Sequence, residues 1–126
     1  MNMNYFLAKT EAEEYSIDDL KRDGSSIWTG VRNPQAKSFL RSMKKGDLVY
    51  IYHTGNVRAI VGLTTVIKEG EEPTFEFKEK FSEPFVTLSQ VKREKKFSDL
   101  RLVRQSRLSV MELPTPFVNW LQKHIK

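Results

Sequence analysis

The stretch Trp28-Thr-Gly-Val-Arg-Asn-Pro-Gln-Ala36 combines a loop rich in functional groups with the start of a helix. Its nine residues include one of the two tryptophans, an arginine, two side-chain amides and a glycine. Asn33-Pro34 predicts the helix start, because asparagine caps free backbone N–H groups and proline fits the first helical position. Trp28 and Arg32 therefore lie on a loop that the following helix fixes at its end.

The helix that follows is expected to be buried along one face. Ala36, Phe39, Leu40 and Met43 are spaced three and four residues apart, as on the apolar face of a helix. A loop fixed in this way suits a small planar ligand. The alternative is that the tryptophan belongs to the core and the arginine is solvated, because large aromatic side chains are usually buried.

Length and composition set the class of protein. The chain has 126 residues, of which 39% are hydrophobic and 11% aromatic, and we expect one domain over residues 1–126 with its own core. No apolar run approaches the ~20 residues needed to span a membrane. The N-terminus lacks signal-peptide features and cysteine is absent. We expect an intracellular, soluble protein, cytoplasmic in a bacterium and nuclear in a eukaryote.

The positive charge is confined to the last third of the chain. Residues 1–84 contain 12 Lys/Arg and 13 Asp/Glu, whereas residues 85–126 contain 9 Lys/Arg and 3 Asp/Glu. A one-sided basic region attracts polyanions, most simply nucleic acid. The alternative is a set of ordinary solvated lysines, which would also explain the Lys92-Arg-Glu-Lys-Lys96 run.

Alternation and turn residues predict an α+β fold. Strands are expected over residues 4–9, 47–54, 58–68 and about 75–81. A short helix with Ser16 as its cap is expected to end near Gly24, and further helices are expected over about 34–43 and 87–94. A last helix is expected to open with Thr115 as its cap and Pro116 as its first residue, and to run to about Ile125. Gly62 lies inside the third strand and indicates a bulge or a close backbone approach. In all, about five or six strands and three or four helices suggest a small curved sheet or barrel.

Recognisable catalytic and cofactor patterns are missing. The chain has two histidines and no cysteine, so no spacing fits a zinc site. The six glycines are isolated and form no phosphate-binding loop. Glu11, Glu13 and Glu14 cluster, but adjacent acids on a polar loop are usually solvated. We therefore expect no metal, no cofactor and no catalytic residue, which favours binding over catalysis.

Four separated stretches together resemble the EVE domain of the PUA-like superfamily. They are Lys9-Thr-Glu-Ala-Glu-Glu-Tyr-Ser16, Trp28–Ala36, Gly46-Asp-Leu-Val-Tyr-Ile-Tyr-His53 and Leu102-Val-Arg-Gln-Ser-Arg-Leu-Ser-Val110. The resemblance implies a curved, mostly antiparallel β-barrel with short helices around it. It also implies a pocket for a modified nucleobase, related to pockets in YTH domains and in SRA domains that take a flipped 5-methylcytosine. Ala12 stands where the family usually has proline, and the segment between Val66 and Phe81 is shorter than in many relatives.

The resemblance places the pocket on residues of the matched stretches. Trp28 would stack on the base, Asn33 would bond its pairing edge, and Arg107 would clamp a phosphate or a base carbonyl. The alternative for the last run is a basic surface turn beside a core strand. The full set of pocket candidates is Lys9, Tyr15, Trp28, Val31, Arg32, Asn33, Tyr52, His53, Ser106, Arg107, Leu108 and Ser109.

The resulting hypothesis is recognition of one modified base, such as a methylated cytosine in DNA or RNA, without catalysis. The base would be unpaired or flipped out, the protein a monomer, and an effector protein a candidate partner. Phosphate contacts are expected from Lys92, Arg93, Lys95, Lys96 and Arg104. The main alternative is a small ASCH-like hydrolase acting on a modified nucleoside or RNA, with Lys9, Glu11 and Tyr15 as acid–base candidates. A third is an interaction module with no nucleic-acid role.

Overall fold

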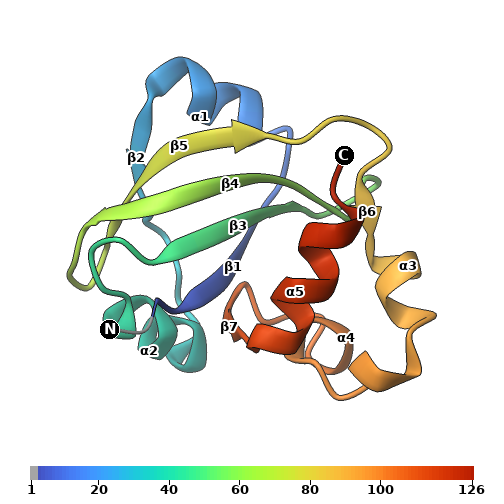
Figure 1. The fold of residues 1–126 in the computed structure, drawn as a ribbon. Coiled ribbons are helices and arrows are strands. Elements are labelled where there is room, and N and C mark those ends of the chain that lie inside the picture. The colour runs from blue at the N-terminus through green and yellow to red at the C-terminus, as the bar shows by residue number, and fades with distance from the viewer. Residues whose placement is uncertain (1–2) are drawn as a thin grey trace.

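The computed structural model describes residues 3–126 and consists of one sheet with short helices around it (Figure 1). Met1 and Asn2 lie outside the described residues. They begin the N-terminal segment that is expected to lack signal-peptide features. The strands are β1 (Tyr5–Thr10), β2 (Ser25–Ile27), β3 (Leu48–His53), β4 (Ala59–Lys68), β5 (Thr74–Lys80), β6 (Val86–Thr87) and β7 (Val110–Leu113). The helices are α1 (Ile17–Asp23), α2 (Pro34–Ser42), α3 (Leu88–Lys92), the 3-10 turn η1 (Lys95–Phe97), α4 (Arg101–Arg104) and α5 (Thr115–His124).

The sheet confirms the predicted α+β class but does not close into a barrel. Its strand order is β2-β5-β4-β3-β1-β7, with β6 paired to β4, and β1 and β3 form its one parallel pair among the described residues. The outer strands β2 and β7 are not paired with each other within residues 3–126. There are seven strands rather than five or six, because β2 and β6 are too short to show an alternation in the sequence.

Strand β3 lies in the middle of the sheet and is buried on both faces. It pairs with β1 on one side and β4 on the other, and five of its six residues are buried. Its two predicted faces, one with Tyr50 and Tyr52 and one with Val49 and Ile51, are both apolar for this reason. The residue at its end, His53, is therefore also drawn into the interior.

Gly62 lies at both a bulge and a close backbone approach, the two features predicted as alternatives for it. Ile51 pairs with Gly62 and Tyr52 pairs with Ile60, so one residue of β4 is left over as a bulge. A Cβ atom at position 62 would overlap the Ile17 side chain and lie 2.8 Å from the carbonyl oxygen of Glu79. The missing side chain lets helix α1 pack directly on β4.

Side-chain caps begin most of the predicted helices. Ser16 and Asp19 form a reciprocal capping box at α1, and Thr87 caps α3. The predicted start of α5 is one residue late, because Pro114 rather than Thr115 is at the cap position. Pro116 is tolerated within the first turn, where its missing N–H has no intrahelical partner to lose. Within residues 3–126, the helices are all too short or too polar to cross a membrane.

Candidate functional site

A cavity of about 380 Å³ lies where strand β1 ends. Four segments far apart in the sequence form its walls: the end of β1 with the loop after it, the loop before α2, the residue after β3, and the segment after α4. The lining residues are Lys9, Thr10, Glu11, Glu14, Trp28, Thr29, Gly30, Val31, Arg32, Thr54, Ser106, Arg107 and Ser109. Seven of the twelve pocket candidates are therefore together: Lys9, Trp28, Val31, Arg32, Ser106, Arg107 and Ser109.

Trp28 is at once a core residue and part of the cavity wall. Its exposed fraction is only 8%, and its ring stacks on Phe75 with 5.0 Å between ring centres and 29° between planes. Its backbone N–H donates to the carbonyl oxygen of Pro73 at 2.9 Å. Strand β5 thus holds the indole in place while part of it still borders the cavity. The two interpretations of Trp28 are not exclusive.

The loop after Trp28 is held by the start of α2, as predicted. Asn33 Oδ1 accepts a 2.9 Å hydrogen bond from the N–H of Ala36. Gly30 has φ +79°, a conformation that side chains other than glycine rarely adopt, and it turns the chain so that Val31 and Arg32 border the cavity. Asn33 itself does not line this cavity, and its oxygen is already engaged as the helix cap.

Lys9 ties strand β1 to the segment after α4. Its ammonium donates to the carbonyl oxygen of Ser106 at 3.0 Å, and its backbone N–H donates to that of Ser109 at 2.8 Å. The ammonium also lies 5.5 Å from the ring centre of Tyr52, within cation–π range. Burial lowers the pKa of Lys9 from its ordinary value of 10.5. Tyr52 is buried beneath this lysine and does not reach the cavity.

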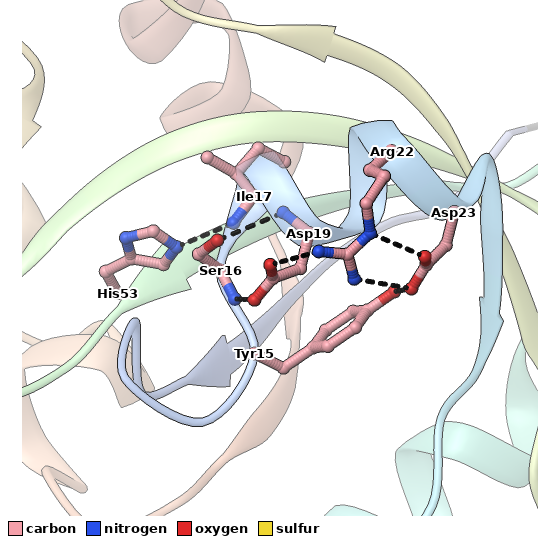
Figure 2. A network of polar contacts seen from close by, with 7 residues as sticks. All are labelled: Tyr15, Ser16, Ile17, Asp19, Arg22, Asp23 and His53. Carbon is pink, nitrogen blue, oxygen red and sulfur yellow. Dashed lines mark hydrogen bonds and ion pairs between the residues drawn. The ribbon is translucent and has the colours of Figure 1, made fainter.

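Tyr15 and His53 face helix α1 instead of the cavity (Figure 2). The Tyr15 hydroxyl donates to Asp23 Oδ2 at 2.8 Å. His53 Nε2 accepts from the N–H of Ile17 at 3.1 Å, so the ring's other nitrogen carries the proton in the neutral form. Burial lowers the pKa of His53 from 6.5, and the Lys80 charge acts the same way while that of Asp18 opposes it.

A second cavity of about 340 Å³ adjoins the first and shares Ser106 and Arg107 with it. Asn33 and Leu108, two further pocket candidates, border this second cavity. Leu108 is mainly a core residue, because only 3% of it is exposed. Together the two cavities account for nine of the twelve candidates; Tyr15, Tyr52 and His53 border neither.

The carboxylates of the first cavity were not predicted as part of a binding pocket. Glu11 and Glu14 both border it, and Glu11 Oε1 accepts a 3.1 Å hydrogen bond from the Thr54 hydroxyl. The signal in the sequence was the position of Glu11 and Glu14 just after a predicted strand. It was missed because adjacent acids on a polar loop are usually solvated. Tyr15, the third member of the alternative acid–base set with Lys9 and Glu11, is turned away.

The five predicted phosphate contacts are all exposed on α3, η1 and α4 or directly beside them. Two of them have acidic neighbours: Arg104 forms a 2.7 Å ion pair with Asp99, and Lys96 lies 3.9 Å from Glu94. Lys92, Arg93 and Lys95 form no ion pair with the residues that the structure describes. Across residues 3–126, no three His, Cys, Asp or Glu side chains are grouped so as to hold a metal ion.

The fold and the matched motifs define a known class of domain. Residues 4–124 match the family model described as the EVE domain, and the chain belongs to this family. A curated relative is the mouse thymocyte nuclear protein 1, which is 36% identical over 115 residues, covering 80% of this chain and 50% of that protein. The chain thus spans about half the length of this relative.

Solved structures share the fold. The NMR structure of a Rhodopseudomonas palustris protein is 32% identical with a TM-score of 0.85, covering 96% of this chain and 92% of that chain. The human THYN1 protein, crystallised in complex with DNA containing 5-methylcytosine, is 23% identical with a TM-score of 0.86. The match covers 95% of this chain and 96% of that chain. An ASCH protein of Zymomonas mobilis is more distant, at 11% identity and a TM-score of 0.60.

Proposed function

We propose that this chain is a nucleic-acid-binding module that takes one modified base into the cavity beside Trp28 and releases it unchanged. 5-Methylcytosine in DNA is the first candidate. The observation that carries the proposal is an indole fixed against the core and bordering a cavity whose rim holds both cations and carboxylates. The likeness to human THYN1, whose structure contains DNA with 5-methylcytosine, supports the choice of base.

The size and walls of the cavity suit a single heterocycle. Its volume of about 380 Å³ is near the lower end of small-molecule sites. Stacking of a base on an aromatic side chain contributes roughly 1–3 kcal/mol. Carboxylates such as those of Glu11 and Glu14 accept hydrogen bonds from an exocyclic amino group, while Arg32 and Arg107 donate to ring nitrogens and carbonyls. Cytosine presents both kinds of group on one edge.

Discrimination of the methyl group depends on the closeness of fit. Burying one methyl group contributes only about 0.8 kcal/mol, which is less than a tenfold change in affinity. Trp28 and Val31 are the apolar residues of the lining, so the methyl group would pack between an indole and a branched side chain. We infer that an unmodified base leaves a gap there.

The backbone of the nucleic acid would lie along the basic last third of the chain. Arg107 is exposed at the cavity, and Arg104 and the Lys92–Lys96 run continue the positive charge on α3, η1 and α4. Extruding a base from a duplex costs a few kcal/mol, so a single strand or a mismatched site should bind more tightly than a paired duplex. Phosphate contacts make the affinity fall with salt.

The oligomeric state, the partner and the cellular compartment of the chain are also proposals. We infer that residues 1–126 act as one domain and as a monomer, because a single base pocket needs no second copy. Such a module would need an effector protein to turn recognition into an outcome. In a eukaryotic source it would act in the nucleus, and in a bacterium in the cytoplasm.

The test is a binding series with matched fluorescent oligonucleotides that differ only in the methyl group of one cytosine. Fluorescence anisotropy is measured for single-stranded and duplex DNA and for the RNA counterparts. The proposal predicts at least about fourfold tighter binding of the methylated single strand, which is the factor that burial of one methyl group alone would give. Equal affinities would refute it. A change in the mass of a modified nucleoside after incubation would instead favour an ASCH-like hydrolase.

A further inference from the structure

We propose that the second cavity is a subsite for the nucleotide next to the modified base, and that the Gln35–Gln105 pair reads the edge of that neighbouring base. This inference rests on the proposed function and extends it from one base to a sequence context. The cavity has a volume of about 340 Å³ and shares Ser106 and Arg107 with the first. Two hollows joined by common residues can hold consecutive units of one strand.

The lining of the second cavity favours hydrogen bonding over stacking. It contains three side-chain amides, from Asn33, Gln35 and Gln105, and no aromatic ring. Arg107, on the boundary between the cavities, is placed to contact the phosphate that links the two nucleotides. Arg104 is less available, because Asp99 pairs with it at 2.7 Å. The amides are therefore the groups left to read a base.

Gln35 and Gln105 hold each other in a fixed orientation. Gln105 Nε2 donates to Gln35 Oε1 at 2.9 Å, and Gln35 Nε2 donates to Gln105 Oε1 at 3.4 Å. Gln35 is in the first turn of α2, Gln105 directly follows α4, and both side chains are half-buried. The pair therefore joins two segments that are 70 residues apart and loses little freedom when a ligand arrives.

The pair also leaves a donor beside an acceptor. Each amide has two N–H groups and two oxygen lone pairs, and the reciprocal bonds use one of each. In such a reciprocal pair the second N–H of Gln105 and the second lone pair of Gln35 lie on the same side of the pair, on atoms 2.9 Å apart. Both side chains border the second cavity. On the major-groove edge of a base, a donor beside an acceptor matches the N6 amino group and N7 of adenine alone, because guanine presents two acceptors there and cytosine and thymine one hydrogen-bonding group each. We infer that the glutamine pair reads this edge of the neighbouring base, and that this base is adenine.

The alternative is that the glutamine pair only links α2 to the segment after α4. Two variants separate these roles. Gln105→Ala removes both the hydrogen bonds to Gln35 and those to the neighbouring base. Gln105→Glu still accepts a hydrogen bond from Gln35 Nε2 and so keeps part of the link, but it has no N–H to donate to N7 of adenine. Gln90→Glu on α3 is the matched control for the added charge, because it borders neither cavity.

The experiment is an affinity series with single-stranded DNA in which one 5-methylcytosine is fixed and each flanking base is varied in turn. The same flanks are measured with unmodified cytosine. We expect the wild-type protein to bind adenine on one flank about tenfold more tightly than the other bases. Both Gln105 variants should reduce this preference to within about twofold while the methylated strand is still preferred. Gln90→Glu should keep the wild-type flank preference.

Three results would overturn the subsite: no flank preference in the wild-type protein, an unchanged preference in Gln105→Glu, or an equal loss of affinity for all flanks in both Gln105 variants. In each of these the methylated strand would still bind more tightly than the unmethylated one. If the wild-type protein does not distinguish methylated from unmethylated strands at any flank, the proposed function itself fails. The two failures are thus separated within one data set.

Discussion

The Lys9 ammonium donates a 3.0 Å hydrogen bond to the backbone carbonyl of Ser106, across 97 residues of sequence. This contact joins the end of strand β1 to the segment that carries Arg107 and Ser109. It also holds a partly desolvated cation in the wall of the cavity, and burial lowers the pKa of Lys9. The wall of the cavity is therefore fixed by a residue that also lines it.

Replacing Lys9 by methionine should separate binding from stability. Methionine keeps an unbranched apolar chain over Tyr52, and water can satisfy the exposed Ser106 carbonyl, so the free energy of unfolding should fall by only about 1 kcal/mol. Loss of the cation and of the tether should weaken binding of a methylated strand by about tenfold or more. Denaturant unfolding and anisotropy measure the two quantities. Lys37→Met, on the exposed side of α2, is the control, and a matching loss in that variant would argue against a role for Lys9.

Arg107 should matter more for binding than a lysine of the exposed basic run. Arg107 borders both cavities, whereas Lys95 borders neither. Arg107→Ala is expected to cost about 1–3 kcal/mol of binding free energy, and Lys95→Ala less than about 1 kcal/mol. Both variants should reduce the slope of affinity against salt between about 50 and about 200 mM. The reverse order of the two effects would move the main contact to η1.

Asn33 is predicted to act as a helix cap and not as the group that bonds the pairing edge of the base. Its Oδ1 is bonded to the N–H of Ala36 at 2.9 Å. Asn33→Ala should therefore lower the free energy of unfolding by about 0.5–2 kcal/mol, while Asn33→Asp, which keeps the oxygen, should be nearly neutral. Thermal and denaturant unfolding measure this. Equal stability of the wild-type protein and both variants would show that the Asn33 side chain does not stabilise α2 as a cap.

His53 should make the protein less stable at acid pH. Its pKa in the folded state lies below 6.5, chiefly because of burial, so the unfolded chain binds the proton more tightly. The stabilisation is complete above 6.5 and is lost as the pH falls through the folded-state pKa. His53→Gln, whose carbonyl oxygen can accept from Ile17, should show a smaller drop in the free energy of unfolding from about pH 7.5 to about pH 5. Identical drops in the two proteins would contradict this role.

Much of the fold was predictable because its signals are local. The caps at Ser16 and Asn33 and the glycine in β4 each leave a short-range pattern in the sequence, and each is confirmed. Closure of the sheet was predicted wrongly, because pairing between the outer strands depends on long-range geometry. Strands β2 and β6 escaped prediction because two or three residues cannot show an alternation.

The candidate site was partly predictable for the same reason. Three of the four matched stretches contribute residues to the cavity and Gly46–His53 contributes none. The sequence could not show which way each side chain turns. The run Tyr52-His53 illustrates this: one ring is buried under Lys9 and the other bonds the N-terminus of α1. Glu11 and Glu14 border the cavity because the loop after β1 forms part of its wall, and their position just after a predicted strand was the only signal of this in the sequence.

The most direct test of the central claim uses Trp28 as its own reporter. The chain has two tryptophans, and Trp120→Phe leaves Trp28 as the single indole. Trp120 is buried against Phe97 and Phe117, so phenylalanine should keep that cluster packed. Titration with a methylated single strand should quench Trp28 fluorescence to saturation at the affinity that anisotropy gives, and the unmethylated strand should quench it only at higher concentration. Binding of the methylated strand with no change in Trp28 emission would show that the base does not stack on Trp28, and would contradict the proposed base pocket.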